Sequence, residues 1–270
     1  MIKTCAFCRQ DKKLTKEHVW PSCFLDRVGR DNAHYSVKSG KVHGADYTVR
    51  DVCSECNNVH LAELDWYFCN LYDRHLSVPL GTDQAVSINY NHDMLCRVLL
   101  KIAYNTARSA GSESAQFFRL LPYVLRGGNC PAGVALIAEL VSPTYIADTS
   151  GPIALVKEIL PTMYRSALGQ LLTPHGRAVV VRVVAVNSFF FHLLLARNPE
   201  NLQSFEMARI EFLSGIQGAV PLDPNAQEVH LRSSLQDSLS SMLPLITAKR
   251  DQYREFFEHN NKRKGTEDKQ

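Results

Sequence analysis

The stretch Val52-Cys53-Ser54-Glu55-Cys56-Asn57-Asn58 decides the fold of the N-terminal region, because its two cysteines match a second pair at Cys5 and Cys8. Each Cys-x-x-Cys pair places two thiolates next to each other, and two such pairs supply the four sulfur ligands of a tetrahedral structural zinc. The long segment between the pairs leaves room for a β-hairpin, followed by a helix that starts at the second pair. The sequence therefore predicts a zinc ion held by Cys5, Cys8, Cys53 and Cys56.

The composition favours metal binding over disulfide bonding. The chain of 270 residues has 8 cysteines, and its first ten residues hold no apolar segment typical of a secretory signal. We therefore expect a cytoplasmic protein, and in that reducing compartment clustered cysteines more often bind metal than pair. A hydrophobic content of 45% excludes a mainly disordered chain, whereas a formal charge of +3 neither indicates nor excludes a nucleic-acid partner.

The apolar segment 178–196 is long enough to cross a bilayer, but Arg182 interrupts it. A charged side chain at mid-membrane costs roughly 2.5–3.5 kcal/mol on insertion scales. The valine and phenylalanine runs on either side of Asn187-Ser188 indicate two buried β-strands joined by a tight turn. We therefore expect no membrane association.

Changes in composition divide the chain near residue 78. Residues 1–78 are rich in cysteine, histidine and charge, and we expect a hairpin over 35–52 and a helix over 54–75. Residues 79–248 are more apolar and read as a mixed α/β domain of unknown role. Residues 249–270 are expected to form a charged C-terminal helix and tail.

Within the second domain the patterns predict both helices and strands. Amphipathic spacing predicts a helix over 95–110 that ends at Gly111, and Pro161 breaks helical signals over 155–172. The remaining predicted elements are a helical segment at 117–126, a strand at 133–140, two strands within 178–196 and a helix at 199–213.

A second motif, Glu17-His18-Val19-Trp20-Pro21, lies between the cysteine pairs. An acidic residue followed by histidine is common, and by itself it is more often a solvated pair than a site. Its order relative to the cysteines changes that expectation. Cys-x-x-Cys, then Glu-His-Val-x-Pro, then Val-Cys-x-x-Cys-Asn-Asn resembles the HNH endonucleases, whose ββα-metal unit is built on a four-cysteine zinc knuckle. The resemblance covers residues 1–75, and it implies an α+β chain with a small, treble-clef-like ββα-metal domain before the mixed α/β domain.

The resemblance implies roles for three residues. His18 would be the general base that takes a proton from the water attacking phosphorus, a task suited to a side chain type that titrates near neutral pH. Glu17 and Asn57 would hold a catalytic divalent cation, and their oxygen atoms suit Mg²⁺ or Mn²⁺. That cation would stabilise the pentacoordinate phosphorus and the departing 3′ oxygen, so the products would carry a 5′ phosphate and a 3′ hydroxyl.

Two positions leave the details of this site open. The family often has an asparagine where this chain has Thr48, so either Thr48, Asp46 or Asp51 positions the loop instead, or the loop is held in another way. His60 follows Asn57 by three residues and is a further candidate ligand of the divalent cation, although a histidine on the surface of a helix is the more common case.

For the other notable residues we expect structural roles. Trp20 and Trp66 could stack on a nucleobase but are expected to pack in the small core. Four cysteines are expected to behave as small apolar side chains: Cys23, Cys69, Cys96 and Cys130. Basic residues near the motif form either a solvated face or a phosphate-binding rim: Lys12, Lys13, Lys16, Arg27, Arg30, Lys38 and Lys41.

Three functions remain open from the sequence. The leading hypothesis is a metal-dependent HNH endonuclease that hydrolyses phosphodiester bonds in DNA, with RNA as another substrate to consider. The alternative is a zinc-stapled module that binds nucleic acid without cutting it. In the third, the zinc unit is a scaffold for protein contacts, and the second domain carries the activity. Under any of the three, the chain could form a homodimer or bind a partner protein through its second domain. A nuclease followed by a separate domain is found in several bacterial antiviral and restriction systems, and on that analogy alone we expect a role in antiviral defence.

Overall fold

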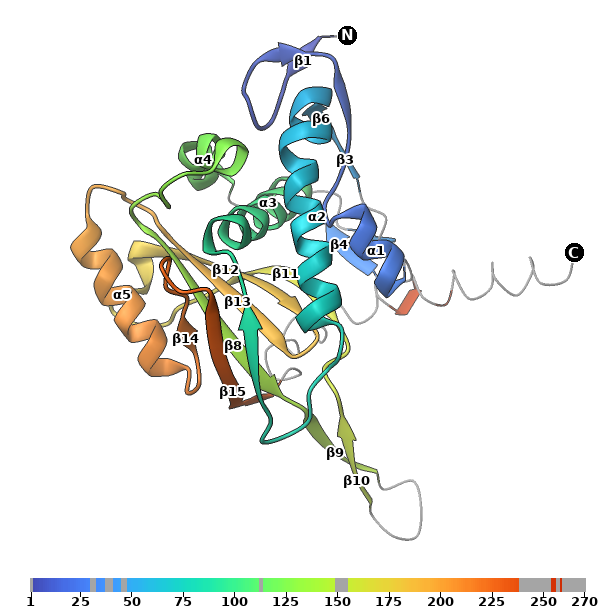
Figure 1. The fold of residues 1–270 in the computed structure, drawn as a ribbon, viewed down its shortest axis with the longest axis vertical. Helices are drawn as coiled ribbons and strands as arrows, with labels where there is room; N and C mark the ends of the chain where they lie inside the picture. The colour runs from blue at the N-terminus through green and yellow to red at the C-terminus, as the bar shows by residue number, and fades with distance from the viewer. Residues whose placement is uncertain are drawn as a thin grey trace, which may run out of the picture.

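The computed structural model describes residues 2–29, 33–36, 41–44, 48–111, 114–148 and 155–237, together with residues 254, 255 and 258. The predicted C-terminal helix and tail at 249–270 therefore lie outside the described residues, apart from these three. The described chain is mixed α and β, with a unit of short strands and helices beside a larger sheet (Figure 1).

Short antiparallel strand pairs build the N-terminal unit. β1 (Lys3–Thr4) pairs with β2 (Asp11–Lys12), and β3 (Leu14–His18) pairs with β6 (Thr48–Cys53). The elements between β3 and β6 are α1 (Ser22–Val28), β4 (Ala33–Ser36) and β5 (Lys41–Gly44), and β4 and β5 pair with each other. The described residues of the hairpin expected over 35–52 therefore all lie in strands.

One long helical segment follows β6 and confirms the helix expected over 54–75. It begins as the π-helical turn η1 (Cys56–Leu61), continues as α2 (Ala62–Leu71) and ends in the π-helical turn η2 (Tyr72–Leu76). Its buried apolar residues recur at three- and four-residue spacing, as in an amphipathic helix that packs on a core. They include Leu61, Leu64, Phe68, Tyr72 and Leu76.

A seven-stranded sheet dominates the described part of the second region. Its strand order is β11-β12-β13-β8-β15-β7, and β14 pairs with β8. Neighbouring strands are antiparallel, except that β15 runs parallel to β8. The strands are β7 (Ala85–Asn89), β8 (Val134–Ser142), β11 (Tyr164–Gly169), β12 (Val179–Val186), β13 (Phe189–Ala196), β14 (Val220–Pro221) and β15 (Glu228–Asp237).

The apolar segment 178–196 forms β12 and β13, which confirms the two strands expected there. Asn187 lies in the tight turn between them with a positive φ of 49°. Among the described residues, no helix has the length and apolarity that crossing a membrane requires.

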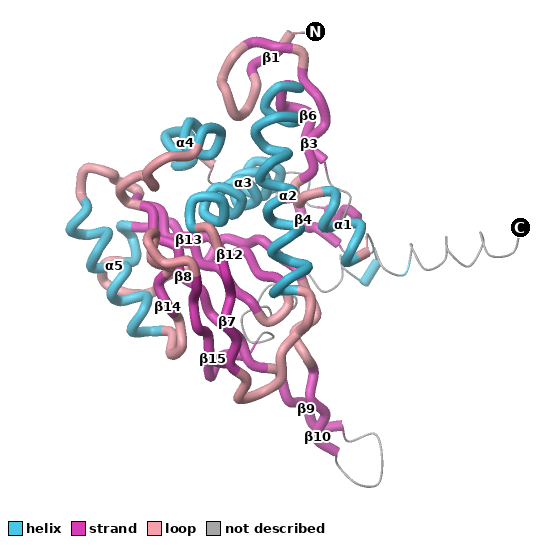
Figure 2. The backbone as a smooth tube through the Cα atoms, in the orientation of Figure 1, coloured by secondary structure: helices cyan, strands magenta, loops and turns pink. Residues whose placement is uncertain are grey.

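Helices pack on both faces of this sheet (Figure 2). On β12, Val180 and Val184 join the core that includes α3 (His92–Ala110), while Val179 and Val181 join a second core with α5 (Leu202–Gly215). The alternation along β12 is what a strand covered on both faces requires. The remaining short helices are η3 (Ala115–Leu120), α4 (Leu121–Arg126) and η4 (Gly176–Ala178).

The larger core crosses the division expected near residue 78. It includes Phe24 and Phe68 of the N-terminal unit, Leu99 of α3 and Phe191 of the sheet. α3 therefore packs against the N-terminal unit on one side and against the sheet on the other.

Residues 155–172 do not form the helical segment that the sequence predicts. They hold β10 (Leu155–Ile159), which pairs with β9 (Thr144–Asp148), and then β11, which pairs with β12. Pro161 lies between the two strands. Cross-strand pairing outweighs the local spacing of apolar residues here. The β9–β10 pair projects from the body of the molecule (Figure 1).

Two of the cysteines expected to act as small apolar side chains form a disulfide instead. Cys23 of α1 and Cys69 of α2 are bonded, with their Cα atoms 6.4 Å apart. The expectation was wrong for this pair because the two cysteines are far apart in sequence, and only the packing of α1 on α2 brings them together. Cys96 and Cys130 are free thiols with sulfur atoms 3.9 Å apart.

Candidate functional site

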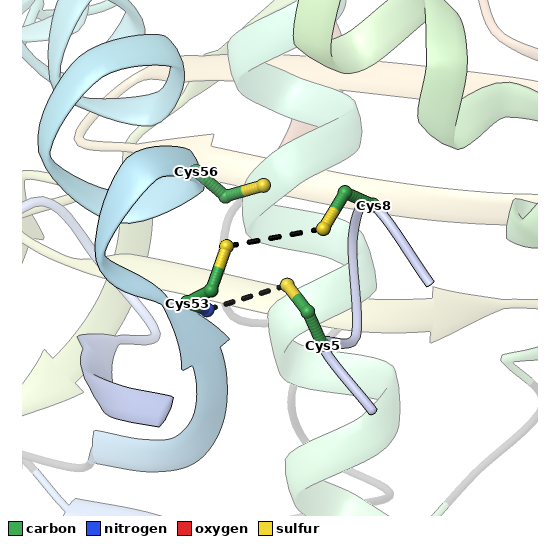
Figure 3. Close-up of side chains that lie close together, drawn as sticks. All are labelled: Cys5, Cys8, Cys53 and Cys56. Carbon is green, nitrogen blue, oxygen red and sulfur yellow. Dashed lines mark hydrogen bonds between the residues drawn. The ribbon is translucent and has the colours of Figure 1, made fainter. Parts of the chain in front are cut away.

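The four cysteines of the two Cys-x-x-Cys pairs meet in one cluster. Cys5 and Cys8 lie in the connection between β1 and β2, Cys53 ends β6, and Cys56 begins η1 (Figure 3). All four sulfur atoms lie within 4.8 Å of one another. The Cys8 and Cys53 sulfurs are 3.8 Å apart, which is roughly the separation expected between ligands in tetrahedral zinc–thiolate geometry with bonds of about 2.3 Å.

Backbone hydrogen bonds hold this cluster in shape. The backbone N–H of Cys53 donates to the Cys5 sulfur over 3.3 Å, and the N–H of Ala6 donates to the carbonyl of Asp51 over 2.7 Å. Arg9 adopts a positive φ of 61° and its N–H donates to the Cys5 carbonyl. The connection between β1 and β2 is thus fixed against β6 before any ligand is considered.

The chemistry of the sulfurs suits a cation. Burial would raise the pKa of Cys5, but hydrogen bonds from backbone N–H groups outweigh burial and lower the pKa to about 7. Burial and the neighbouring thiols raise the pKa of Cys56. A second thiolate beside Cys5 is therefore unfavourable unless a cation lies between the sulfurs, and zinc deprotonates its thiol ligands. The four cysteines fit a structural zinc.

The strand that carries the second motif places Glu17 in the interior. Only 3% of Glu17 is exposed, and its Oε1 lies 2.7 Å from the Nζ of Lys101 on α3. The same ammonium contacts the carboxylate of Asp65 on α2. Burial alone would lower the pKa of Lys101, but the carboxylates of Asp65 and Glu17 outweigh burial and raise it, so the side chain is charged at neutral pH.

α3 also holds His18 by its backbone. The Nδ2 of Asn105 donates to the His18 carbonyl over 3.0 Å and to Glu17 Oε1 over 3.3 Å. The Oδ1 of Asn105 accepts a hydrogen bond of 2.6 Å from Arg108, which also pairs with Asp51 of β6. The His18 side chain is half-buried at the end of β3.

Asn57 joins the start of the long helix to β3. Its Nδ2 donates to the Lys16 carbonyl over 2.7 Å and to Thr15 Oγ1 over 3.0 Å. Thr48 lies directly opposite His18 in the β3–β6 register. The structure therefore places Thr48 beside His18 and attaches Asn57 to β3 at Thr15 and Lys16, just before the Glu17-His18 step.

The geometry does not support Glu17 as a ligand of a catalytic Mg²⁺ or Mn²⁺. Glu17 is buried against an ammonium group, whereas Mg²⁺ in proteins keeps several water ligands. The hydrogen bonds of Asn57 to β3 use its amide nitrogen, whereas a metal would bind its amide oxygen. Among the residues that the structure describes, the four cysteines are the one group of three or more candidate metal-ligating side chains, and Glu17, His18 and His60 do not form a second.

Sequence reasoning did not identify Asp65, Lys101 or Asn105. The signal that could have found the last two is their place on the buried side of an amphipathic helix. Lys101, Asn105 and Arg108 recur at four- and three-residue spacing and therefore share one face of α3. Polar side chains on such a face need buried partners.

The two tryptophans differ in exposure. Trp20 is 8% exposed and packs on Phe24, as expected, whereas Trp66 is 70% exposed, contrary to expectation. Leu64 and Phe68 take the buried side of α2, which leaves Trp66 on the outer side.

The expected basic residues are partly engaged by acids. Lys12 pairs with Glu55 over 2.5 Å and Arg27 pairs with Asp73 over 2.6 Å. Lys13 and Lys16 are exposed. Arg30 and Lys38 lie outside the described residues, and the side chain of Lys41 is not described either.

Comparison of the chain with protein-family models, with curated proteins and with solved structures gives no match.

Proposed function

We propose that the protein is an HNH-type endonuclease that hydrolyses phosphodiester bonds in DNA or RNA, with His18 as general base. The observation that carries the proposal is the contact between β3 and the helix that follows the second cysteine pair. Asn57, the residue directly after Cys56, is hydrogen-bonded to β3 next to the Glu17-His18 step. This is the order of parts that the resemblance to HNH nucleases implies.

In the proposed reaction His18 accepts a proton from water while the water oxygen bonds to phosphorus. The bond from phosphorus to the 3′ oxygen then breaks, which leaves a 5′ phosphate and, after that oxygen takes a proton from solvent, a 3′ hydroxyl. Exposed Lys13, just before β3, and exposed Lys16, within it, would attract the phosphate backbone. A divalent cation would supply charge stabilisation, but Glu17 is buried against Lys101 and does not fit it, so no step is assigned to that ion.

The test is cleavage of supercoiled plasmid and of single-stranded RNA by the zinc-loaded protein, with Mg²⁺, with Mn²⁺ and with neither. His18→Ala should lower the rate by roughly a hundredfold or more, because it removes the general base. His230→Ala is the matched control, because His230 lies on β15 against Ser87 of β7. Equal cleavage by wild type and His18→Ala would contradict the proposal.

Binding of nucleic acid without cleavage is the second candidate. The observation that favours it is the burial of Glu17 against Lys101, which leaves the reacting end of β3 without an open carboxylate. Retarded migration of DNA or RNA with no product in any cation condition would support binding over hydrolysis.

A further inference from the structure

We propose that the ammonium group of Lys101 is the built-in cation of this site and takes the position between Glu17 and Asp65 that a divalent metal ion would otherwise occupy. The inference rests on the proposed function only in taking Glu17-His18 as the reacting end of β3.

Three elements converge on this ammonium group. Glu17 comes from β3, Asp65 from α2 and Lys101 from α3, and Lys101 Nζ contacts a carboxylate oxygen of each acid, at 2.7 Å for Glu17. Two carboxylates that face one point are the ligands that a hard cation such as Mg²⁺ or Mn²⁺ prefers. Here a covalently tethered cation already lies at that point.

Burial keeps the Lys101 ammonium group in its position between the two carboxylates. Lys101 is 0% exposed and Glu17 is 3% exposed. Without the ammonium group, the buried carboxylate of Glu17 would face the half-buried carboxylate of Asp65, and uncompensated buried charges are strongly unfavourable. A dissolved cation would therefore have to displace Lys101 rather than fill a free position.

The same arrangement assigns Glu17 and Lys101 a positioning role. Glu17 precedes His18 in β3, and Asn105 binds both the Glu17 carboxylate and the His18 carbonyl. The ion pair thus fixes the direction in which β3 presents His18. Lys101 touches no surface from which substrate could approach, so it acts through Glu17.

Manganese binding measured by electron paramagnetic resonance tests the proposal, with zinc-loaded full-length protein and Mn²⁺ alone as the probe. Wild type should show no Mn²⁺ site that depends on Glu17, so wild type and Glu17→Gln should titrate alike. Lys101→Ala should gain one site per chain, roughly tenfold or more tighter than any site in wild type, because two carboxylates then lack a cation. The gained site should disappear in the double variant Lys101→Ala/Glu17→Gln.

Lys157→Ala is the matched control, because it removes one positive charge from exposed β10, far along the chain from the site. A Mn²⁺ site in wild type that is lost in Glu17→Gln would overturn the proposal, and so would a folded Lys101→Ala that binds no more Mn²⁺ than Lys157→Ala. If Lys101→Ala does not fold, the comparison of wild type with Glu17→Gln still decides the question. This experiment measures metal binding and not cleavage. A result that overturns the proposal for Lys101 therefore does not contradict the proposed nuclease activity, and an absence of cleavage does not contradict the proposal for Lys101.

Discussion

Asn105 is the side chain on which the placement of His18 depends most directly. It is 0% exposed, donates to both Glu17 and His18, and accepts from Arg108. A buried amide with all of these partners connects β3 to α3 at a single point. Loss of the amide leaves several buried polar groups without a partner, and each such group is costly.

We expect Asn105→Ala to lower the free energy of unfolding by about 2–4 kcal/mol, because a buried network loses its central group. Urea denaturation followed by circular dichroism measures the change. Asn70→Ala is the control, because Asn70 is half-buried and donates within its own helix to the Trp66 carbonyl. Similar stability for the two variants would show that the network does not hold β3.

At the scale of elements, α3 connects the N-terminal unit to the sheet. One face carries Lys101, Tyr104, Asn105 and Arg108, which reach β3, the connection between β1 and β2, and β6. On the side of the sheet, α3 joins the larger core with apolar side chains of β12 and β13. Polar contacts from one face of α3 therefore act together with this shared apolar core in orienting the N-terminal unit on the sheet.

The first turn of α3 predicts an acid sensitivity. His92 is 9% exposed, and burial lowers its pKa below 6.5, although the carboxylates of Asp93 and Asp223 partly offset this. Below pH 6.5 the unfolded chain binds a proton at His92 more readily than the folded chain does, so stability falls as the pH drops through this range. Wild type should thus lose more stability than His92→Asn between pH 7 and pH 5, as measured by thermal unfolding. Parallel pH profiles for the two proteins would contradict this assignment.

The contact between α1 and α2 predicts a thiol count. With Cys23 and Cys69 bonded, 6 of the 8 cysteines are free. Denatured, metal-free protein prepared without reductant should therefore react with six equivalents of a thiol reagent, and with eight after reduction. Eight equivalents before reduction would show that the disulfide does not form. Cys23→Ser/Cys69→Ser should give six equivalents in both states.

At the scale of the whole molecule, residues with a local signature were predictable and residues joined by packing were not. The cysteine cluster, the helix at 54–75 and the β12–β13 pair follow from spacing, alternation and turn residues. The strands within 155–172 and the contacts of Lys101 depend on which segments meet in space. For the same reason the Glu17-His18 step did not predict the contact of Glu17 with the ammonium group of Lys101.

The central proposal is that Cys5, Cys8, Cys53 and Cys56 hold a zinc ion that fixes η1 against β6 and so supports the position of β3 and His18. Metal analysis combined with X-ray absorption spectroscopy tests this zinc centre most directly. The predicted result is one zinc ion per chain with four sulfur ligands at about 2.3 Å. Cys53→Ser should lose the zinc and become protease-sensitive, while Cys130→Ser, which changes a free cysteine outside the cluster, should retain it. Wild-type protein that folds without zinc, or Cys53→Ser that keeps zinc and resists protease, would contradict a structural zinc at the four cysteines.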